Sequence, residues 1–324
     1  MATHPTSNAG PTPQPETKEP QLADPGLRDL SLRDYRAIVI RAGKEALDDG
    51  ITDWAAALAY YLFLSLPATL LLTLGTFGLV AGTDAVDSLM DRFAQVAPAD
   101  AVSLVGDSLD RVVENQSGSI VMIVVGAVLA VWTATGAMTA LMRALNRAYD
   151  RPESRGFVRQ RTTALVMFAL AAIAFALAFG LLVLGPYLSR WIGEAANLES
   201  LTRWLWWTAQ WPILVFALLA MFAVVLYVGP NVDHPRWRFV TPGALFTVVA
   251  WLAISGLFAV YVSMFGSYNK AWGSLAAVIV MLTWLWLSAL VLLLGAEINA
   301  EAERSRELRR GEPAESEILA PEKG

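Results

Sequence analysis

The sequence contains no cysteine, and only two of its 324 residues are histidines. The absence of cysteine excludes disulfides, thiol catalysis and metal sites built on cysteine. Neither histidine belongs to a metal-binding spacing such as H-x-H or H-E-x-x-H, since His4 lies in a proline-rich segment and His234 in a short loop. No phosphate-binding glycine loop and no dinucleotide fingerprint occurs. The sequence therefore predicts no cofactor, no metal and no enzymatic activity.

Charged residues are also scarce. They make up 16% of the chain, against about 25% in a typical soluble domain, whereas apolar residues make up 56%. The stretch from Ala271 to Ala296 has no Asp, Glu, Lys or Arg, and a helix of that length crosses the roughly 30 Å hydrocarbon core of a bilayer. We therefore predict an all-α, polytopic membrane protein with six transmembrane helices. The expected spans cover about residues 54–80, 119–142, 162–188, 205–228, 240–265 and 271–296.

Lys and Arg are distributed unevenly between the segments that flank these spans. When the segments are numbered alternately, one set holds 19 of these residues and the other holds 5. Because basic residues are retained on the cytoplasmic side, both the N- and C-termini are predicted to be cytoplasmic. Loop 83–118 is then extracytoplasmic. Its two short amphipathic patterns fit either a lid over a cavity or a plain helical cap on the bundle.

The first fifty residues are less apolar than the rest. The first tail carries six prolines before the first helical pattern and is predicted to be disordered. The helix that follows is amphipathic, so it would either lie flat on anionic lipid or pack against the cytoplasmic ends of other helices. Its apolar positions are Leu32, Tyr35, Val39, Ala42 and Ala46. The predicted parts are a disordered tail, a juxtamembrane helix, a six-helix membrane domain and a charged cytoplasmic tail, over 1–26, 27–50, 51–303 and 304–324.

A group of polar residues is predicted at the cytoplasmic ends of the spans. It comprises Asp53, Arg143, Asn146, Arg147, Glu297 and Asn299. Glu297 follows directly after an apolar run, where an unpaired carboxylate would be costly. We therefore predict that Glu297 forms an ion pair with Arg143 or Arg147. Such a pair would either fix helix packing or act as a substrate gate.

The spans themselves contain few polar groups. Pro67 lacks an N–H group, so it predicts a kink in the first span. The candidates for lining a cavity are the mid-span residues Ser65, Thr69, Trp132, Ser255 and Trp284. Hydroxyls in such helices commonly bond to their own backbone or to a neighbour, which is the alternative interpretation. No span has an ionised residue in its central part, which disfavours ion-coupled transport.

Three stretches together resemble a known family. They are ALAYYLFLSLPATLLL in the first span, ALNRAYD after the second, and FGSYNKAWGSLAAVIVMLTWLWLSALVLLLGAEINAE near the end. Over roughly residues 30–305 the chain resembles the YihY/BrkB family. The resemblance implies a multi-pass protein of the bacterial inner membrane, an envelope protein suspected of transport and, in one branch, linked to serum resistance. The family has carried the label ribonuclease BN, but the sequence offers no residues for that activity.

These observations lead to one principal functional hypothesis and two alternatives. The principal one is a permease-like transporter or flippase that moves a lipid or amphiphile. The alternatives are a structural envelope protein without transport and, less well supported, a membrane ribonuclease. The expected partners are membrane lipids, and a homo-oligomer is left open. Nucleic acid is not expected, because retention on the cytoplasmic side already explains the basic loop 143–161.

Overall fold

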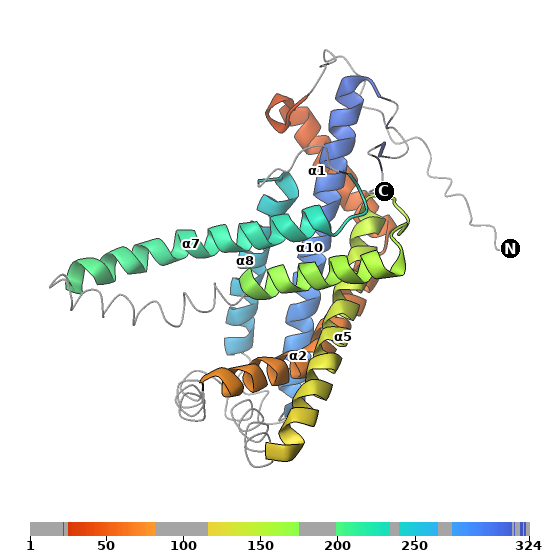
Figure 1. Cartoon of the computed structure of the whole chain (residues 1–324). Coiled ribbons are helices and arrows are strands. Elements are labelled where there is room, and N and C mark those ends of the chain that lie inside the picture. Colours follow the sequence, from red (N-terminus) through yellow and green to blue (C-terminus); the bar gives the residue numbers. More distant parts are fainter. Residues whose placement is uncertain are drawn as a thin grey trace.

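The computed structural model describes most of the predicted helices. The described residues are 22, 25–81, 116–174, 199–233, 240–264, 274–312, 314, 318, 319 and 321. Every regular element among them is helical, so the predicted all-α class is confirmed for this part of the chain. In order they are η1 (Leu27–Asp29), α1 (Leu32–Asp48), α2 (Ile51–Ala81), α5 (Gln116–Ala148), the helix Phe157–Ala174, α7 (Glu199–Val228), α8 (Pro242–Met264) and α10 (Ser274–Arg310) (Figure 1). Nearly all of tail 1–26 and of loop 83–118 lies outside the described residues, so the two interpretations of that loop stay open.

Five of these helices are long and apolar enough to cross a membrane. They include the segments Ala127–Ala148, Phe157–Ala174, Ser200–Val228, Pro242–Met264 and Leu275–Arg310. A sixth apolar segment, Ile51–Leu66, is shorter within the residues for which side chains are described. In lipid, a helix satisfies its own backbone hydrogen bonds, so long apolar helices are the elements expected of a membrane protein. These helices confirm the prediction of an all-α protein with several helices able to cross a membrane.

The helix α10 is the axis of the main bundle. Its 37 residues extend over about 55 Å at 1.5 Å per residue, which exceeds a hydrocarbon core of about 30 Å. Its apolar half packs against α2 and α8, α2 in turn packs along α5, and α1 lies along the charged half of α10. Ala55, Leu145, Leu293 and Ala296 are at most 1% exposed in the shared core.

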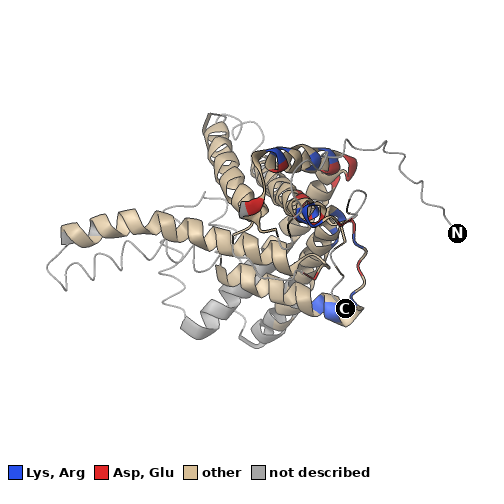
Figure 2. Cartoon of the chain, turned by 90° about the horizontal axis from the view of Figure 1, so that it is seen from above, with Lys and Arg blue, Asp and Glu red and all other residues tan. Residues whose placement is uncertain are grey.

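Two helices project away from this bundle. The helix Phe157–Ala174 and α7 run to one side of α10, as both views show (Figures 1 and 2). They join the bundle near one end, where Met167 belongs to the same core cluster as Leu145. Beyond that point α7 exposes large apolar side chains, among them Trp204 and Trp207 at 61% and 62%. Such exposure suits a helix whose solvent is lipid.

The helix α1 starts at a well-formed cap and packs against α10. The Ser31 hydroxyl accepts from the Asp34 N–H (3.2 Å), and the Asp34 carboxylate accepts from the Ser31 N–H (2.8 Å). Of the two arrangements predicted for this helix, packing against another helix is the one observed. The face that packs carries Ile38, Ala42 and Ala46, each at most 2% exposed.

The buried face of α1 agrees only in part with the predicted one, because Ala42 and Ala46 are buried as expected. Leu32 and Val39 were expected on it, but they are 90% and 63% exposed. Ile38 is buried in place of Val39, and Arg41 on this helix pairs with Glu301 of α10. Gly50 adopts a left-handed conformation (φ 63°), which lets the chain turn from α1 into α2 without a steric penalty.

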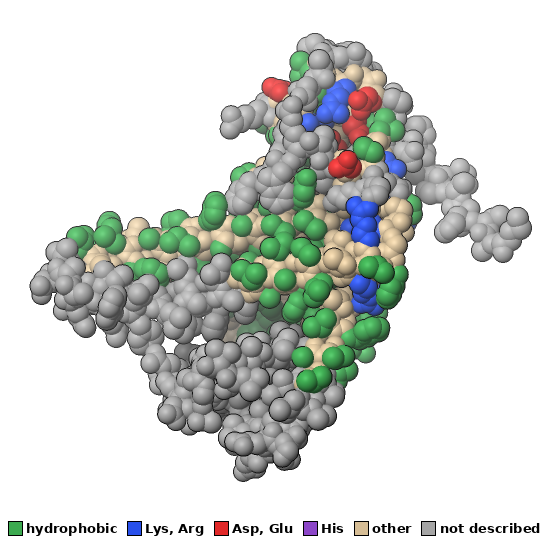
Figure 3. Space-filling model, in the orientation of Figure 1, with side chains coloured by type: hydrophobic (Ala, Val, Ile, Leu, Met, Phe, Trp, Pro, Cys, Tyr) green, Lys and Arg blue, Asp and Glu red, His purple; other side chains and the backbone are tan. Residues whose placement is uncertain are grey.

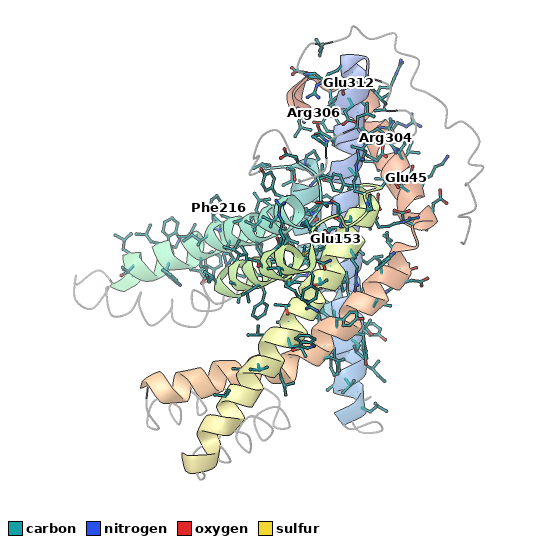
Figure 4. All side chains as sticks on the ribbon, turned by 45° about the vertical axis from the view of Figure 1, so that its right-hand side comes forward. Glu45, Glu153, Phe216, Arg304, Arg306 and Glu312 are labelled. Carbon is teal, nitrogen blue, oxygen red and sulfur yellow. The ribbon has the colours of Figure 1, made fainter. Side chains whose placement is uncertain are left out.

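Pro67 lies within α2, whose ribbon changes direction part-way along its length (Figure 4). A bend of this kind is what a proline inside a helix produces, since it removes one backbone hydrogen bond and clashes with the preceding turn. The side chains of Pro67 and Thr69 lie outside the described part of α2.

The segment 304–324, predicted to be a charged tail, includes residues that pack against the bundle. The helix α10 continues to Arg310, beyond the start of the predicted tail, because Ala, Glu and Arg are strong helix formers. The chain then returns to the bundle, where Ile318 is 2% exposed in the main core. The Ile318 carbonyl accepts from Arg151, and the Asp233 N–H donates to the Pro321 carbonyl (2.7 Å). The described residues of this segment therefore contact the loops that follow α5 and α7.

Candidate functional site

A layer of ion pairs joins α1 to the charged half of α10. Arg41 pairs with Glu301 and also donates to Ser305 (2.6 Å). Arg304 donates to Glu301 (2.7 Å) and to Glu45 (3.4 Å), and Figure 4 shows Glu45 beside Arg304. We call this the α1–α10 charged layer. Figure 2 shows that charged residues gather along the helices at this end of the molecule, whereas the projecting helices are uncharged for most of their length.

The layer continues to the far end of α10. Arg309 donates to the Asp34 carboxylate through two nitrogens, at 2.7 and 3.1 Å. Asp34 thus caps α1 and holds α10 at the same time. Arg306 donates to Glu303 (2.6 Å) and to the Pro25 carbonyl (2.8 Å). Because these arginines are at most 10% exposed, their carboxylate partners matter more for stability than surface ion pairs would.

A second polar network lies where α5 ends, and Asn146 is at its centre. The Asn146 amide donates to Glu153 (2.9 Å) and accepts from the Asn231 backbone N–H (2.6 Å). Arg155 binds the same Glu153 through two nitrogens (2.6 and 2.7 Å) and donates to the Gly229 carbonyl (2.9 Å). We call this the Asn146 network. It joins the loop after α5 to the loop after α7.

The charge of Glu153 in the Asn146 network is balanced by the neighbouring Arg155. Partial burial acts to raise the pKa of Glu153, but the hydrogen bonds and charge of Arg155, with the Asn146 amide, hold that pKa below its usual value. Glu153 is therefore ionised and paired with Arg155. Such a network fixes two loops in place.

Arg147 does not pair with Glu297. Its Nε donates to Asp49 Oδ1 (3.0 Å), at the turn between α1 and α2. Burial raises the pKa of Asp49 to about 6, with Arg147 lowering it and the nearby Asp150 and Glu45 raising it. Arg147 is 56% exposed, so solvent weakens its effect on Asp49.

Glu297 is buried among like charges. It is 2% exposed, and none of the described residues donates a hydrogen bond or forms an ion pair with its side chain. The predicted pair with Arg143 or Arg147 is therefore wrong, because Arg147 is taken by Asp49 and Arg143 points to the exterior. The charges acting on Glu297 come from carboxylates, namely Asp49, Glu45, Asp150 and Glu301. A negative charge at this position would be costly.

Asn299 has a structural partner. Its Oδ1 accepts from the Gly243 N–H (2.8 Å), which otherwise has no partner at the start of α8. Gly243 and Gly295 allow α8 and α10 to approach closely, and Thr247 lies at the same contact with its hydroxyl donating to the Gly243 carbonyl (2.7 Å). The other predicted member of the polar group, Asp53, is exposed in the first turn of α2.

The candidate cavity residues do not converge on one place. The Ser65 hydroxyl donates to the Leu62 carbonyl of its own helix (2.7 Å). Trp284 on α10 donates to Ser255 on α8 (3.3 Å), so these two join adjacent helices. Trp132 is 63% exposed on α5, where the Arg161 guanidinium lies over its ring. Among the residues that the structure describes, no three His, Cys, Asp or Glu side chains are grouped to hold a metal ion.

The sequence interpretation missed the residues that do most of the joining. They are Arg41, Arg155, Asn231, Glu301 and Arg304. A signal for two of them was present in EINAEAERSRELRR, where Glu and Arg recur at helical spacing directly after the last span. Nothing local marks Asn231 or Arg155, because their partners are distant in the sequence.

Comparison with known proteins establishes the family. The sequence model of the family described as virulence factor BrkB matches residues 42–318. The chain belongs to this family. It is 32% identical over 255 residues to the ribonuclease-like protein YfkH of Bacillus subtilis (strain 168), covering 78% of this chain and 90% of that protein. No solved structure matches the chain.

Two further BrkB relatives carry the name UPF0761 membrane protein. The one from Alteromonas mediterranea is 27% identical over 277 residues, covering 85% of this chain and 90% of the relative. The one from Azoarcus sp. (strain BH72), azo3165, is 26% identical over 267 residues, covering 80% and 62%. Together with the long apolar helices, these names identify a multi-pass integral membrane protein.

Proposed function

We propose that this BrkB protein is a non-enzymatic, permease-like transporter or flippase that moves a lipid or amphiphile across the bacterial inner membrane. The observation that carries the proposal is the separation of charge from the spans. The ion pairs of the α1–α10 charged layer and the Asn146 network lie at one end of the bundle. The helices below that end meet their surroundings with apolar side chains, hydroxyls and indoles. Such a surface suits a passenger that is itself largely apolar.

The proposal includes the arrangement in the membrane. We infer six spans from the apolar runs of the sequence, and the cytoplasmic position of both termini from the distribution of its basic residues. In this arrangement the charged half of α10 lies outside the hydrocarbon core, because about 20 Å of this helix lies beyond its apolar run. A reporter fused after residue 324 should be active only if its reaction occurs in the cytoplasm. An exported reporter would contradict this orientation.

Transport is tested by reconstitution. The purified full-length protein is placed in liposomes that contain a fluorescent phospholipid, and a membrane-impermeant quencher is added outside. If the protein moves lipid, the quenched fraction rises above that of protein-free liposomes, because labels from the inner leaflet reach the outside. A fraction equal to that of protein-free liposomes, with the protein correctly folded and inserted, would refute the proposal.

One observation favours the alternative of a structural envelope protein. Several polar groups in the spans are already bonded within the bundle. Trp251 on α8 donates to Ser288 on α10 (3.0 Å), and the Trp251 and Trp284 rings meet edge to face at 5.9 Å. A closely packed pair of helices holds a shape well. The liposome assay separates the two functions, since a structural protein would leave the lipid distribution unchanged.

A further inference from the structure

Arg161, in the second turn of the helix Phe157–Ala174, has no acidic partner among the described residues. The arginines that are more deeply buried each contact a carboxylate. They are Arg155, Arg304, Arg306 and Arg309. The contacts of Arg161 are one hydroxyl and two aromatic rings. Its positive charge is therefore not balanced by any described side chain.

The two rings hold the guanidinium in place. Its central carbon is 5.0 Å from the centre of the Trp132 ring on α5 and 5.6 Å from that of Phe157, one turn earlier in the same helix. Both distances fall within the range of cation–π attraction. A guanidinium that lies over aromatic rings keeps its N–H groups in its own plane, where they can meet a planar or tetrahedral oxyanion.

Most of those N–H groups are unused. Arg161 Nη1 donates to the Thr135 hydroxyl (3.3 Å), and that hydroxyl donates its own proton to the Val131 carbonyl (2.7 Å). Thr135 therefore acts as an acceptor that orients one end of the guanidinium. A guanidinium has five N–H donors, so the remaining donors meet no acceptor among the described residues.

The surroundings of this charge are apolar and face outward. Trp132, Phe157 and Val158 are 63%, 68% and 77% exposed, and Leu129 is 53% exposed on the same side of α5. Figure 3 shows Lys and Arg side chains bordered by hydrophobic side chains on the side of the molecule where α5 lies. In a membrane protein such a surface meets lipid, where an unpaired cation is costly. A phosphate group is the anion that a bilayer provides, and guanidinium binds it through paired hydrogen bonds.

We propose that Arg161, held by Trp132, Phe157 and Thr135, binds the phosphate group of a phospholipid. The site deepens the proposed function and rests on it, since a lipid that is moved would be recognised here by its phosphate. Binding itself is measured separately from movement. A phosphate diester in a lipid and free inorganic phosphate share this chemistry, so the test includes both.

The test measures lipid binding to the full-length protein in detergent by native mass spectrometry. The probes are dioleoylphosphatidylglycerol, dioleoylphosphatidylcholine, dioleoylglycerol, which has no phosphate, and inorganic phosphate. The wild type should retain both phospholipids and not dioleoylglycerol. Arg161→Gln should bind phospholipid roughly tenfold more weakly, the scale of one charge-assisted hydrogen bond. Arg161→Lys should be intermediate, because it keeps the charge without the planar fork.

Arg33→Gln is the matched control, since Arg33 is an exposed arginine on α1, far along the chain from this site. It should bind phospholipid like the wild type. Equal binding by the wild type and Arg161→Gln would overturn the site, as would equal retention of dioleoylglycerol and phosphatidylglycerol. Displacement of phospholipid by millimolar inorganic phosphate would assign the site to free phosphate and overturn the lipid assignment.

Two results would distinguish a failure of the proposed lipid site from a failure of the proposed transport function. If Arg161→Gln loses lipid binding but wild-type protein moves no lipid in liposomes, the transport proposal fails and the site stands. If the wild type moves lipid and Arg161→Gln binds and moves it equally well, the site fails and transport stands. Should Arg161→Gln not fold, the comparison of dioleoylglycerol with phosphatidylglycerol on the wild type, together with Arg161→Lys, still decides the question.

Discussion

Replacing Gly295 with alanine should separate α8 from α10. A Cβ on Gly295 would overlap the Thr247 hydroxyl oxygen and lie 2.9 Å from the Gly243 carbonyl oxygen and 3.3 Å from Thr247 Cβ. Thr247 is fully buried, so its side chain has little room to move aside. Overpacking of this kind costs about 1–3 kcal/mol. If α8 shifts, the bond from the Gly243 N–H to Asn299 lengthens as well, which costs about 1 kcal/mol more.

The assay is thermal unfolding of the purified protein in detergent, followed by tryptophan fluorescence. Gly256→Ala is the control, because Gly256 lies in α8 and a Cβ there would meet nothing within 4 Å. Gly295→Ala should unfold at a lower temperature than both the wild type and Gly256→Ala. Equal unfolding temperatures for the two alanine variants would refute the close contact of α8 with α10.

A second-site change makes the test sharper. Thr247→Ala removes the oxygen that a Gly295 Cβ would overlap, so the double variant should regain part of the lost stability. Gly243→Ala offers no such remedy, because its Cβ would overlap the Gly295 backbone carbonyl. If Thr247→Ala fails to improve Gly295→Ala, the clash lies elsewhere, and the reasoning from this contact is wrong.

Three further outcomes are expected from the polar networks. The raised pKa of Asp49, about 6 against an ordinary 3.8, means that the folded state binds its proton more tightly, so the free energy of unfolding should fall as pH rises from about 4 to about 6. Asp49→Asn should lack this fall, as the difference from wild type in pH-dependent unfolding would show. Glu297→Gln should unfold no earlier than the wild type, because a buried carboxylate without a cation gains nothing from its charge; a large loss would indicate an ion pair. Asn146→Leu should lower the free energy of unfolding by about 1–3 kcal/mol, measured as a lower unfolding temperature, since the Glu153 and Asn231 groups lose a buried partner.

The membrane class and the helical spans could be predicted because lipid imposes them directly on composition. A run without charge, such as that from Ala271 to Ala296, has few alternatives to a spanning helix. The same argument says little about which polar side chains meet. Asn299 was predicted at the cytoplasmic end of its span, but its bond to the Gly243 N–H depends on how α8 starts beside α10.

The error on Glu297 shows the limit more clearly. The cost of an unpaired carboxylate next to an apolar run suggested that Glu297 must pair with an arginine, and Arg143 and Arg147 were the candidates at the same ends of the spans. In the structure the turn at Gly50 brings Asp49 to Arg147 first. Whether Arg147 pairs with Asp49 or with Glu297 depends on the path of the chain between α1 and α2. Periodicity and charge counts do not predict that path.

The amphipathic helix α1 could be located from its pattern, but its role could not. A basic amphipathic helix before a membrane span suits a lipid surface as well as a protein surface. What decides between them is α10, which continues past its span and presents Glu301 and Arg309 at the spacing that Arg41 and Asp34 require. The charged end of α10 is thus both the extension of a membrane helix and the partner of α1. Arg161 differs from the arginines of that layer, because it lies outside the layer and none of the described carboxylates pairs with it. This difference is the reason for proposing a lipid phosphate as its partner.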